Sequence, residues 1–325
     1  MSITAGQDAL ASDFISTSAG TADSGKVPKL DANGKLDVTF GKFGGTGADG
    51  ALSISSGTTT IDCANAAVVI KNYTSISITS TGKLAFSNPH TNGTIVILRS
   101  QGNVTLTSST SAMVDMSSMG AAGGNGITCS AGTVAGLNGN EPNSNVYLAS
   151  GRAGFGAANN GGAGNTGAAG TYVTTLVAGL GKYGTPLIVG AGGGSGGDGG
   201  GTGLTGAGGR GGGGIIIECA GAWNFTTSGG ISVAGGAGGN GASGRGNGAG
   251  GGGGFCVVQY NTLTSNSGTI TVSGGTGGTG ATSSGKTGGG GASQTANGVT
   301  GNGNLQTGVN GGDGWSSVSA NSNYF

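Results

Sequence analysis

Residues Gly280 to Thr287 match the phosphate-binding pattern G-x-x-x-x-G-K-[ST], which makes them the first candidates for chemistry in this chain. In a working site of this kind, the loop opens a helix whose N-terminus faces the phosphates. Here four glycines, 288–291, follow the loop, and a helix cannot start on them. Because a chain this rich in Gly, Ser and Thr produces such matches by chance, we expect neither nucleotide nor other cofactor binding.

Residues that usually perform acid–base catalysis are few. The single histidine, His90, follows Pro89 in a Ser-Asn-Pro-His-Thr-Asn stretch that is typical of a turn. The sequence offers it no identifiable acid–base partner. Asp62 and Asp115 are expected at strand ends and not as a carboxylate pair. We therefore predict no catalytic residues and no enzymatic activity.

The four cysteines, Cys63, Cys129, Cys219 and Cys256, form no C-x-x-C pair. With one histidine they cannot supply a familiar zinc-binding set, so we predict no metal site. Cys219 and Cys256 lie in strand-like segments, where a cysteine behaves as a small buried hydrophobe. Disulfide formation is an open alternative, since four cysteines allow three pairings.

Composition excludes several classes of partner. Charged residues make up 7% of the chain, against about 25% in ordinary proteins, and the formal net charge is zero. There is no basic patch of the kind that binds nucleic acid. The longest apolar runs are about four or five residues, whereas a membrane-spanning helix needs about 20. We expect neither nucleic-acid binding nor membrane insertion.

Glycine accounts for 82 of the 325 residues, and in several segments it follows a three-residue period. In the run 235–241 the side chains fall at Ala237 and Asn240, and Thr276 and Thr279 repeat this spacing. A polyproline-II-type helix has three residues per turn and no internal hydrogen bonds. Such glycine segments can approach until N–H meets C=O on a neighbour. We therefore predict packed polyglycine-II helices, which favours a structural role over catalysis.

Strand-like segments alternate with the glycine runs, which argues against a flexible linker. Residues 75–79 and 104–107 alternate with period two, and 95–98 form a short apolar run. Three aromatic residues in such segments are expected in the core: Trp223, Phe225 and Phe255. The predicted fold class is all-β, with repetitive β-solenoid or sandwich-like strands combined with packed polyglycine-II helices.

Three regions follow from these patterns. We predict an N-terminal attachment or exchange arm over 1–50, a β-rich domain over 51–119 and a glycine-rich repeat region over 120–325. Within the third region, a strand–strand–glycine unit of about 40 residues starts at Gly214 and again at Gly254. Units of this size stack, each burying the face of its neighbour.

Two groups of residues are candidates for contacts with other molecules. A strand in the arm could pair with another subunit, and its assembly candidates are Lys35, Leu36, Val38 and Phe40. Loops and chain ends carry recognition more often than stacked strands do. The surface-recognition candidates are accordingly Tyr172, Tyr183, Trp315, Tyr324 and Phe325.

The arm segment from Ser24 to Asp37, SGKVPKLDANGKLD, resembles linker modules of bacteriophage tail-fibre proteins. The glycine-rich body is similar in character to the distal adhesins of T-even-type phage long tail fibres, whose tips stack polyglycine-II helices and present variable loops to outer-membrane receptors. The resemblance implies a virion attachment protein that forms a trimer or polymer with copies of itself and binds a cell-surface receptor. Its expected location is extracellular, on a virion tail.

The alternative is a self-polymerising extracellular filament. In that case the arm adds as a strand to the open sheet edge of the next subunit, on a cell surface. The segment from Met1 to Asp8 has neither a basic nor an apolar region typical of a secretory signal, which favours the phage interpretation. A third class, ice or surface binding through a threonine-rich face, lacks a regular Thr-x-Thr array.

Overall fold

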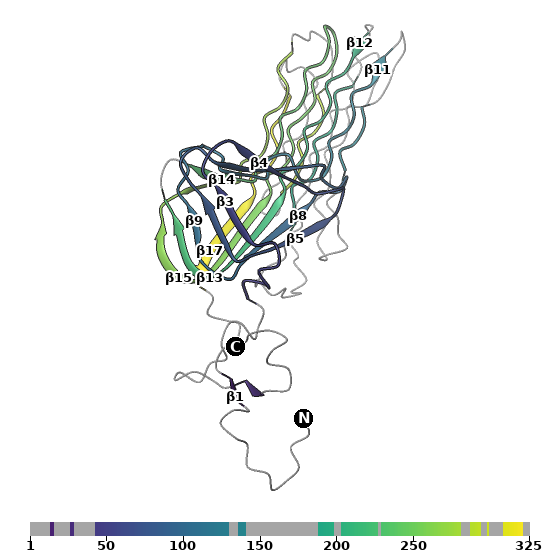
Figure 1. Cartoon of the computed structure of the whole chain (residues 1–325). Helices are drawn as coiled ribbons and strands as arrows, with labels where there is room; N and C mark the ends of the chain where they lie inside the picture. Colours follow the sequence, from purple (N-terminus) through teal and green to yellow (C-terminus); the bar gives the residue numbers. More distant parts are fainter. Residues whose placement is uncertain are drawn as a thin grey trace, which may run out of the picture.

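The computed structural model describes residues 14–15, 27–28, 43–129, 136–140, 188–197, 203–226, 229–280, 287–293, 298 and 308–320. Most of them belong to two regions (Figure 1). One is a body of two β-sheets, which we call the sheet body. The other, the glycine bundle, is a set of extended segments that project from it, made of residues 116–127, 136–140, 188–197, 205–213, 233–254, 272–280, 287–293 and 308–314.

The larger sheet has eight strands, and each of its ladders is parallel. The strands are β3 (Ala51–Ile54), β5 (Val68–Tyr73), β6 (Ser75–Ile78), β8 (Ile95–Ser100), β9 (Val104–Leu106), β13 (Gly214–Phe225), β15 (Phe255–Asn266) and β17 (Trp315–Ala320). Strand β13 pairs first with β8 and then with β9, because it is long enough to span both. β-Branched and aromatic side chains, which favour strands, dominate these segments.

The smaller sheet has five strands in the order β16-β14-β10-β7-β4, again all parallel. They are β4 (Thr58–Asp62), β7 (Lys83–Ser87), β10 (Val114–Asp115), β14 (Gly230–Ser232) and β16 (Thr269–Thr271). Two short pairs lie apart, a parallel one and an antiparallel one: β1 (Phe14–Ile15) with β2 (Val27–Pro28), and β11 (Thr128–Cys129) with β12 (Gly203–Leu204).

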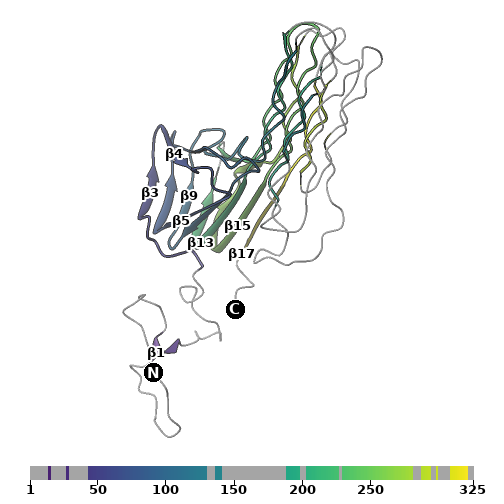
Figure 2. The same cartoon turned by 90° about the vertical axis from the view of Figure 1, so that its right-hand side faces the viewer.

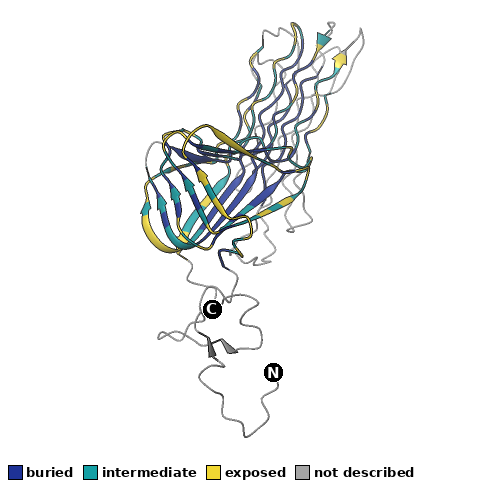
Figure 3. Cartoon of the chain, viewed as in Figure 1, coloured by how far each residue is buried: buried dark blue, intermediate teal, exposed yellow. Residues whose placement is uncertain are grey.

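The main hydrophobic core lies between the two sheets (Figure 3). Ile78 and Val104 of the larger sheet and Leu84 and Ile231 of the smaller one are completely buried in it. Trp223 is also fully buried, and its Nε1–H donates to Asn266 Oδ1 at 3.0 Å. This polar anchor satisfies the indole inside an otherwise apolar layer.

The aromatic residues expected in the core are buried as predicted. The rings of Trp223 and Phe225 lie 5.7 Å apart between centroids, in a tilted arrangement within the main core. Phe255 belongs to a second apolar cluster on the outer face of the larger sheet, formed by Ile95, Val189, Ile216, Phe255 and Val257 with Ile97 and Trp315 against it. The first half of β13 is therefore buried on both faces, as is usual for parallel sheets.

The glycine bundle connects the sheets. Residues 205–213, 246–254 and 308–314 lead into β13, β15 and β17, so the bundle occupies the place that helices usually take between parallel strands. Along 190–196, successive N–H groups donate in rotation to three neighbouring segments, at N···O distances between 2.8 and 3.2 Å. The acceptors, in order, are the carbonyls of Gly212, Ala292, Asn140, Gly209, Gly289, Leu137 and Gly206.

The predicted fold class is wrong. The described residues form two parallel sheets of eight and five strands, and not a β-solenoid or sandwich with polyglycine-II helices. Strand lengths range from two residues in β10 to 12 in β13 and β15. In the described residues there is no helix, and the glycine segments are extended chain without regular secondary structure of their own.

Candidate functional site

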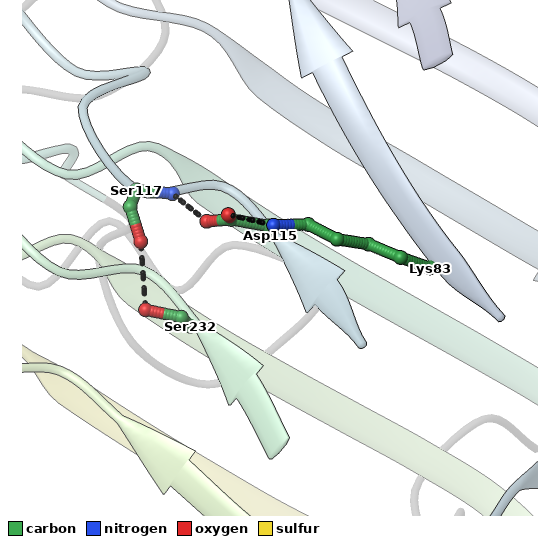
Figure 4. A network of polar contacts seen from close by, with 4 residues as sticks. All are labelled: Lys83, Asp115, Ser117 and Ser232. Carbon is green, nitrogen blue, oxygen red and sulfur yellow. Dashed lines mark hydrogen bonds and ion pairs between the residues drawn. The ribbon is translucent and has the colours of Figure 1, made fainter. Parts of the chain in front are cut away.

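The outer face of the smaller sheet carries a polar network (Figure 4). Lys83 Nζ lies 2.7 Å from Asp115 Oδ2, and the backbone N–H of Ser117 donates to Asp115 Oδ1 at 3.0 Å. The hydroxyls of Ser117 and Ser232 are 2.7 Å apart, and either can be the donor. Lys83, Asp115 and Ser232 lie on β7, β10 and β14, where each alternates with a core residue of the same strand, and register pairs Asp115 with Ser232. Ser117 follows β10 by two residues.

The Asp115 carboxylate is held in its charged form. Burial alone would raise its pKa, but hydrogen bonds from Lys83 and Ser117, together with the charge of Lys83, bring the pKa below the ordinary value. The network is therefore a fixed ion pair with two ordered hydroxyls, and it is chemically suited to hydrogen bonding and not to proton transfer.

Threonines extend this polar face to both of its edges. Thr58 and Thr60 on β4 and Thr269 and Thr271 on β16 are exposed. Register places Thr271 beside Ser232, and Ser232 beside Asp115. Neighbouring strands are about 4.8 Å apart, so the face presents polar groups at a regular spacing. Such a face can hydrogen-bond an extended polar ligand or surface.

Arg210 joins the sheet body to the bundle. Its Nη2 donates to the carbonyls of His90 and Gly120, both at 2.9 Å, and its Nε donates to the carbonyl of Ser118 at 3.2 Å. Desolvation by burial lowers the pKa of Arg210. One guanidinium thus satisfies three carbonyls where the chain leaves the smaller sheet.

His90 is a turn residue, as predicted. Its carbonyl accepts the N–H of Gly93 at 2.9 Å, which closes a tight turn. Its Nδ1 accepts the N–H of Asn92 at 3.1 Å. The imidazole therefore supports the local backbone.

A second ion pair lies inside the larger sheet. Arg99 Nε of β8 and Glu218 Oε2 of β13 are 3.1 Å apart, and register places the two residues directly beside each other. Glu218 is fully buried, whereas about a quarter of the Arg99 side chain is exposed. Breaking a buried ion pair leaves an uncompensated charge, although the intact pair itself need not add stability. We assign this pair a structural role.

Cys219 and Cys256 are the small buried hydrophobes that we expected, and Cys63 is a third buried cysteine. Cys63, Cys219 and Cys256 are buried free thiols. Burial raises the pKa of Cys219 to about 11 and that of Cys256 to about 12. Thiols this far from ionisation are poor nucleophiles and poor metal ligands.

Most of the sequence-predicted site residues lie outside the described part of the chain: Lys35, Leu36, Val38, Phe40, Tyr172, Tyr183, Tyr324 and Phe325. Trp315 is described. It begins β17, is partly exposed and packs against the outer apolar cluster. The phosphate-loop match is described only at Gly280 and Thr287.

Sequence reasoning missed the Lys83–Asp115–Ser117–Ser232 network and the Arg210 contacts. An Asp-x-Ser step directly after a strand was a usable signal, because Asp side chains commonly accept a backbone N–H two residues on. The Arg210 contacts had no such signal, since its three acceptors lie at least 90 residues away in the sequence.

The described residues offer neither a metal site nor a membrane-spanning helix. Among them, no group of three or more His, Cys, Asp or Glu residues is placed to hold a metal ion. None of the described segments forms a helix that is long and apolar enough to span a membrane.

Comparison with known proteins gave no match to a family model, to a curated protein or to a solved structure.

Proposed function

We propose that this chain is a non-enzymatic structural and adhesive fibre protein of the phage tail-fibre kind. It assembles with copies of itself and presents loops to a cell-surface receptor, outside the cell. The proposal combines the sequence resemblance of the arm with the build of the sheet body and the bundle.

The observation that carries the proposal is the continuity between the two regions. Residues 211–214, 251–254 and 311–314 pass from bundle to sheet without a hinge-like loop. Each of these inbound segments is hydrogen-bonded to neighbours on its way, for example by Gly212 to Gly252 at 2.8 Å. Because backbone hydrogen bonds join these segments to their neighbours up to the start of each strand, the bundle and the sheet body together are suited to bearing load.

The polar face of the smaller sheet is a second surface for attachment. Its threonines and the Lys83–Asp115–Ser117–Ser232 network match the hydrogen-bonding groups of a glycan or another polar cell-surface component. The face would act together with the loop candidates Tyr172 and Tyr183, which the sequence suggests for recognition.

The alternative is a self-polymerising extracellular filament. Open sheet edges favour it, because unpaired strand edges are templates for strand addition. In this version the protein needs no receptor.

Electron microscopy and surface binding test the proposal together. The purified chain at micromolar concentration should form defined oligomers or fibres, and it should bind intact bacterial cells. Assembly without any cell binding would favour the filament. A monomer that binds no surface, or that turns over a substrate, would contradict the proposal.

A further inference from the structure

The two sheets contain three rows of five parallel strands each. The larger sheet contains two of these rows, and β13 and β15 run through both. The near row, next to the bundle, is β5-β8-β13-β15-β17, and the far row is β3-β6-β9-β13-β15. The third row is the smaller sheet, β4-β7-β10-β14-β16. In all three rows the strands follow one another in chain order. One end of each row therefore holds its first strands in the sequence (the early end), and the other holds its last (the late end; Figure 2).

The rows are shifted relative to one another by one strand. The chain first forms β3 in the far row and β4 in the smaller sheet, with no strand in the near row. It then adds one strand to each of the three rows, namely β5, β6 and β7. At the early end, β3 and β4 therefore extend one strand beyond β5. At the late end, β17 extends one strand beyond β15 and β16. The two ends are complementary steps.

The hydrogen-bond register of the near row is the same at every step. In each case, the first residue of a strand donates its N–H to the residue just before the paired position on the preceding strand. The four bonds are Ile95 to Ala67 at 2.9 Å, Gly214 to Thr94 at 3.1 Å, Phe255 to Gly213 at 3.3 Å and Trp315 to Gly254 at 3.1 Å. Because the backbone N–H of Trp315 points to β15, the backbone N–H groups of Ser316 and Val318 point to the other edge of β17, which no described strand occupies.

Among the described residues, the strands at the late end lack the usual protection of edges, whereas the early end keeps one charge on β5 (Lys71) and one on β4 (Asp62). Natural edge strands carry charges, prolines or bulges that prevent addition of another strand. The second half of β15 (261–266), β16 and β17 contain neither charge nor proline. Three of the large exposed apolar side chains lie at these edges, namely Leu263 at 50%, Val68 at 36% and Ile70 at 47% exposure.

We infer that the occupant of each stepped end is a second copy of this chain, stacked head to tail. Strand β17 of one copy pairs with β5 of the next, while β3 and β4 of the next copy pair with β15 and β16 of the first. Strand direction is preserved, because every ladder in these rows is already parallel. Such a contact is heterologous, so it propagates and builds an open filament.

This inference rests on the proposed self-assembly and replaces the N-terminal arm as its mechanism. The test uses two full-length variants, each with one end blocked. Ile70→Lys blocks the early end, and Leu263→Lys blocks the late end. Leu204→Lys is the matched control, since Leu204 is 54% exposed but lies on β12 of the short β11–β12 pair, away from both stepped ends.

Size-exclusion chromatography with light scattering gives the readout, and thermal unfolding checks that each variant is folded. We expect filaments from the wild type and from Leu204→Lys, and monomers from each end variant alone. An equimolar mixture of the two end variants should give a heterodimer, because each supplies the intact end that the other lacks.

Two results would overturn the inference in different ways. If both end variants polymerise like the wild type, the stepped ends are not the contact, and loss of polymer on deleting residues 1–42 would then support exchange of the arm. If the wild type itself stays monomeric at every concentration, the self-assembly beneath the inference fails as well. Cell binding by that monomer would leave only the adhesive part of the proposed function.

Discussion

The sheet body and the glycine bundle are ordered by different means. In the sheet body, apolar side chains such as Ile78 and Leu84 fill the space between two sheets. The bundle has few large side chains. Its segments lie close enough for the N–H groups of one to donate to the carbonyls of the next. Ordered structure in this chain therefore depends either on a side-chain core or on backbone pairing between segments.

The largest expected effect is on the sheet body. Trp223→Ala removes the largest fully buried side chain and leaves the amide of Asn266 without its indole donor. We expect the free energy of unfolding to fall by about 4 kcal/mol, as for other buried aromatic truncations. Urea unfolding followed by circular dichroism measures it. Leu263→Ala, at a half-exposed position, is the control, and equal losses for the two variants would contradict a core centred on Trp223.

The second prediction applies the same logic to the bundle. A Cβ at Gly250 would overlap the carbonyl of Gly275, whereas a Cβ at Gly239 would have its nearest neighbour, the Ala207 nitrogen, at 3.1 Å. Gly250→Ala should therefore cost about 1–3 kcal/mol through overpacking, and Gly239→Ala much less.

Thermal unfolding of the two glycine variants, measured side by side, distinguishes these outcomes. Equal stability would show that the bundle tolerates side chains inside it, and the contrast between the two regions would break down.

Arg210 lies at the boundary between the sheet body and the bundle, where it bonds carbonyls of the connecting segments. Arg210→Ala removes the guanidinium donor from the carbonyls of Ser118 and Gly120 and from that of His90, which keeps the N–H of Gly93, for a cost of about 2 kcal/mol. The rate of amide hydrogen exchange should then rise in the bundle segment around Gly120 and not in β13. Arg210→Lys should restore part of the protection, because it keeps a charge but not the fork of donors. Uniform loss of protection throughout both regions would refute a local clamp.

The smallest effect concerns pH. Because the folded-state pKa of Asp115 lies below its ordinary value of 3.8, the carboxylate stabilises the fold at higher pH. That contribution, about 1 kcal/mol, is complete above the ordinary value and is lost as the pH falls through the folded-state pKa. Asp115→Asn should abolish it, so the difference in stability between wild type and variant should shrink on acidification. A difference that does not change with pH would contradict the ion pair.

Part of the fold could be predicted from the sequence. Period-two alternation in 75–79 marked a strand that exists as β6, and the apolar run 95–98 lies within β8. The side chains of Ala237, Asn240, Thr276 and Thr279, set apart by the glycine period, are exposed. These features depend on local periodicity, which sequence records directly.

The fold class and the polar site could not be predicted, because they depend on pairing between distant segments. Strand β13 pairs with β8 and β9 more than 100 residues earlier, and periodicity gives no parallel partner for it. The ion pair of Lys83 with Asp115 forms across strands 32 residues apart. The assembly candidate Phe40 and the loop candidate Tyr172 lie outside the described residues and stay predictions.

The backbone pairing along 190–196 has a consequence for heat capacity. Unfolding of apolar cores raises the heat capacity, whereas exposure of polar groups lowers it. Opening the sheet body exposes isoleucine, leucine and tryptophan, but opening the bundle exposes mainly peptide groups. The bundle therefore adds little to the heat capacity of unfolding, and so little to the curvature of the free energy of unfolding with temperature. Its order persists in the cold, where hydrophobic cores weaken.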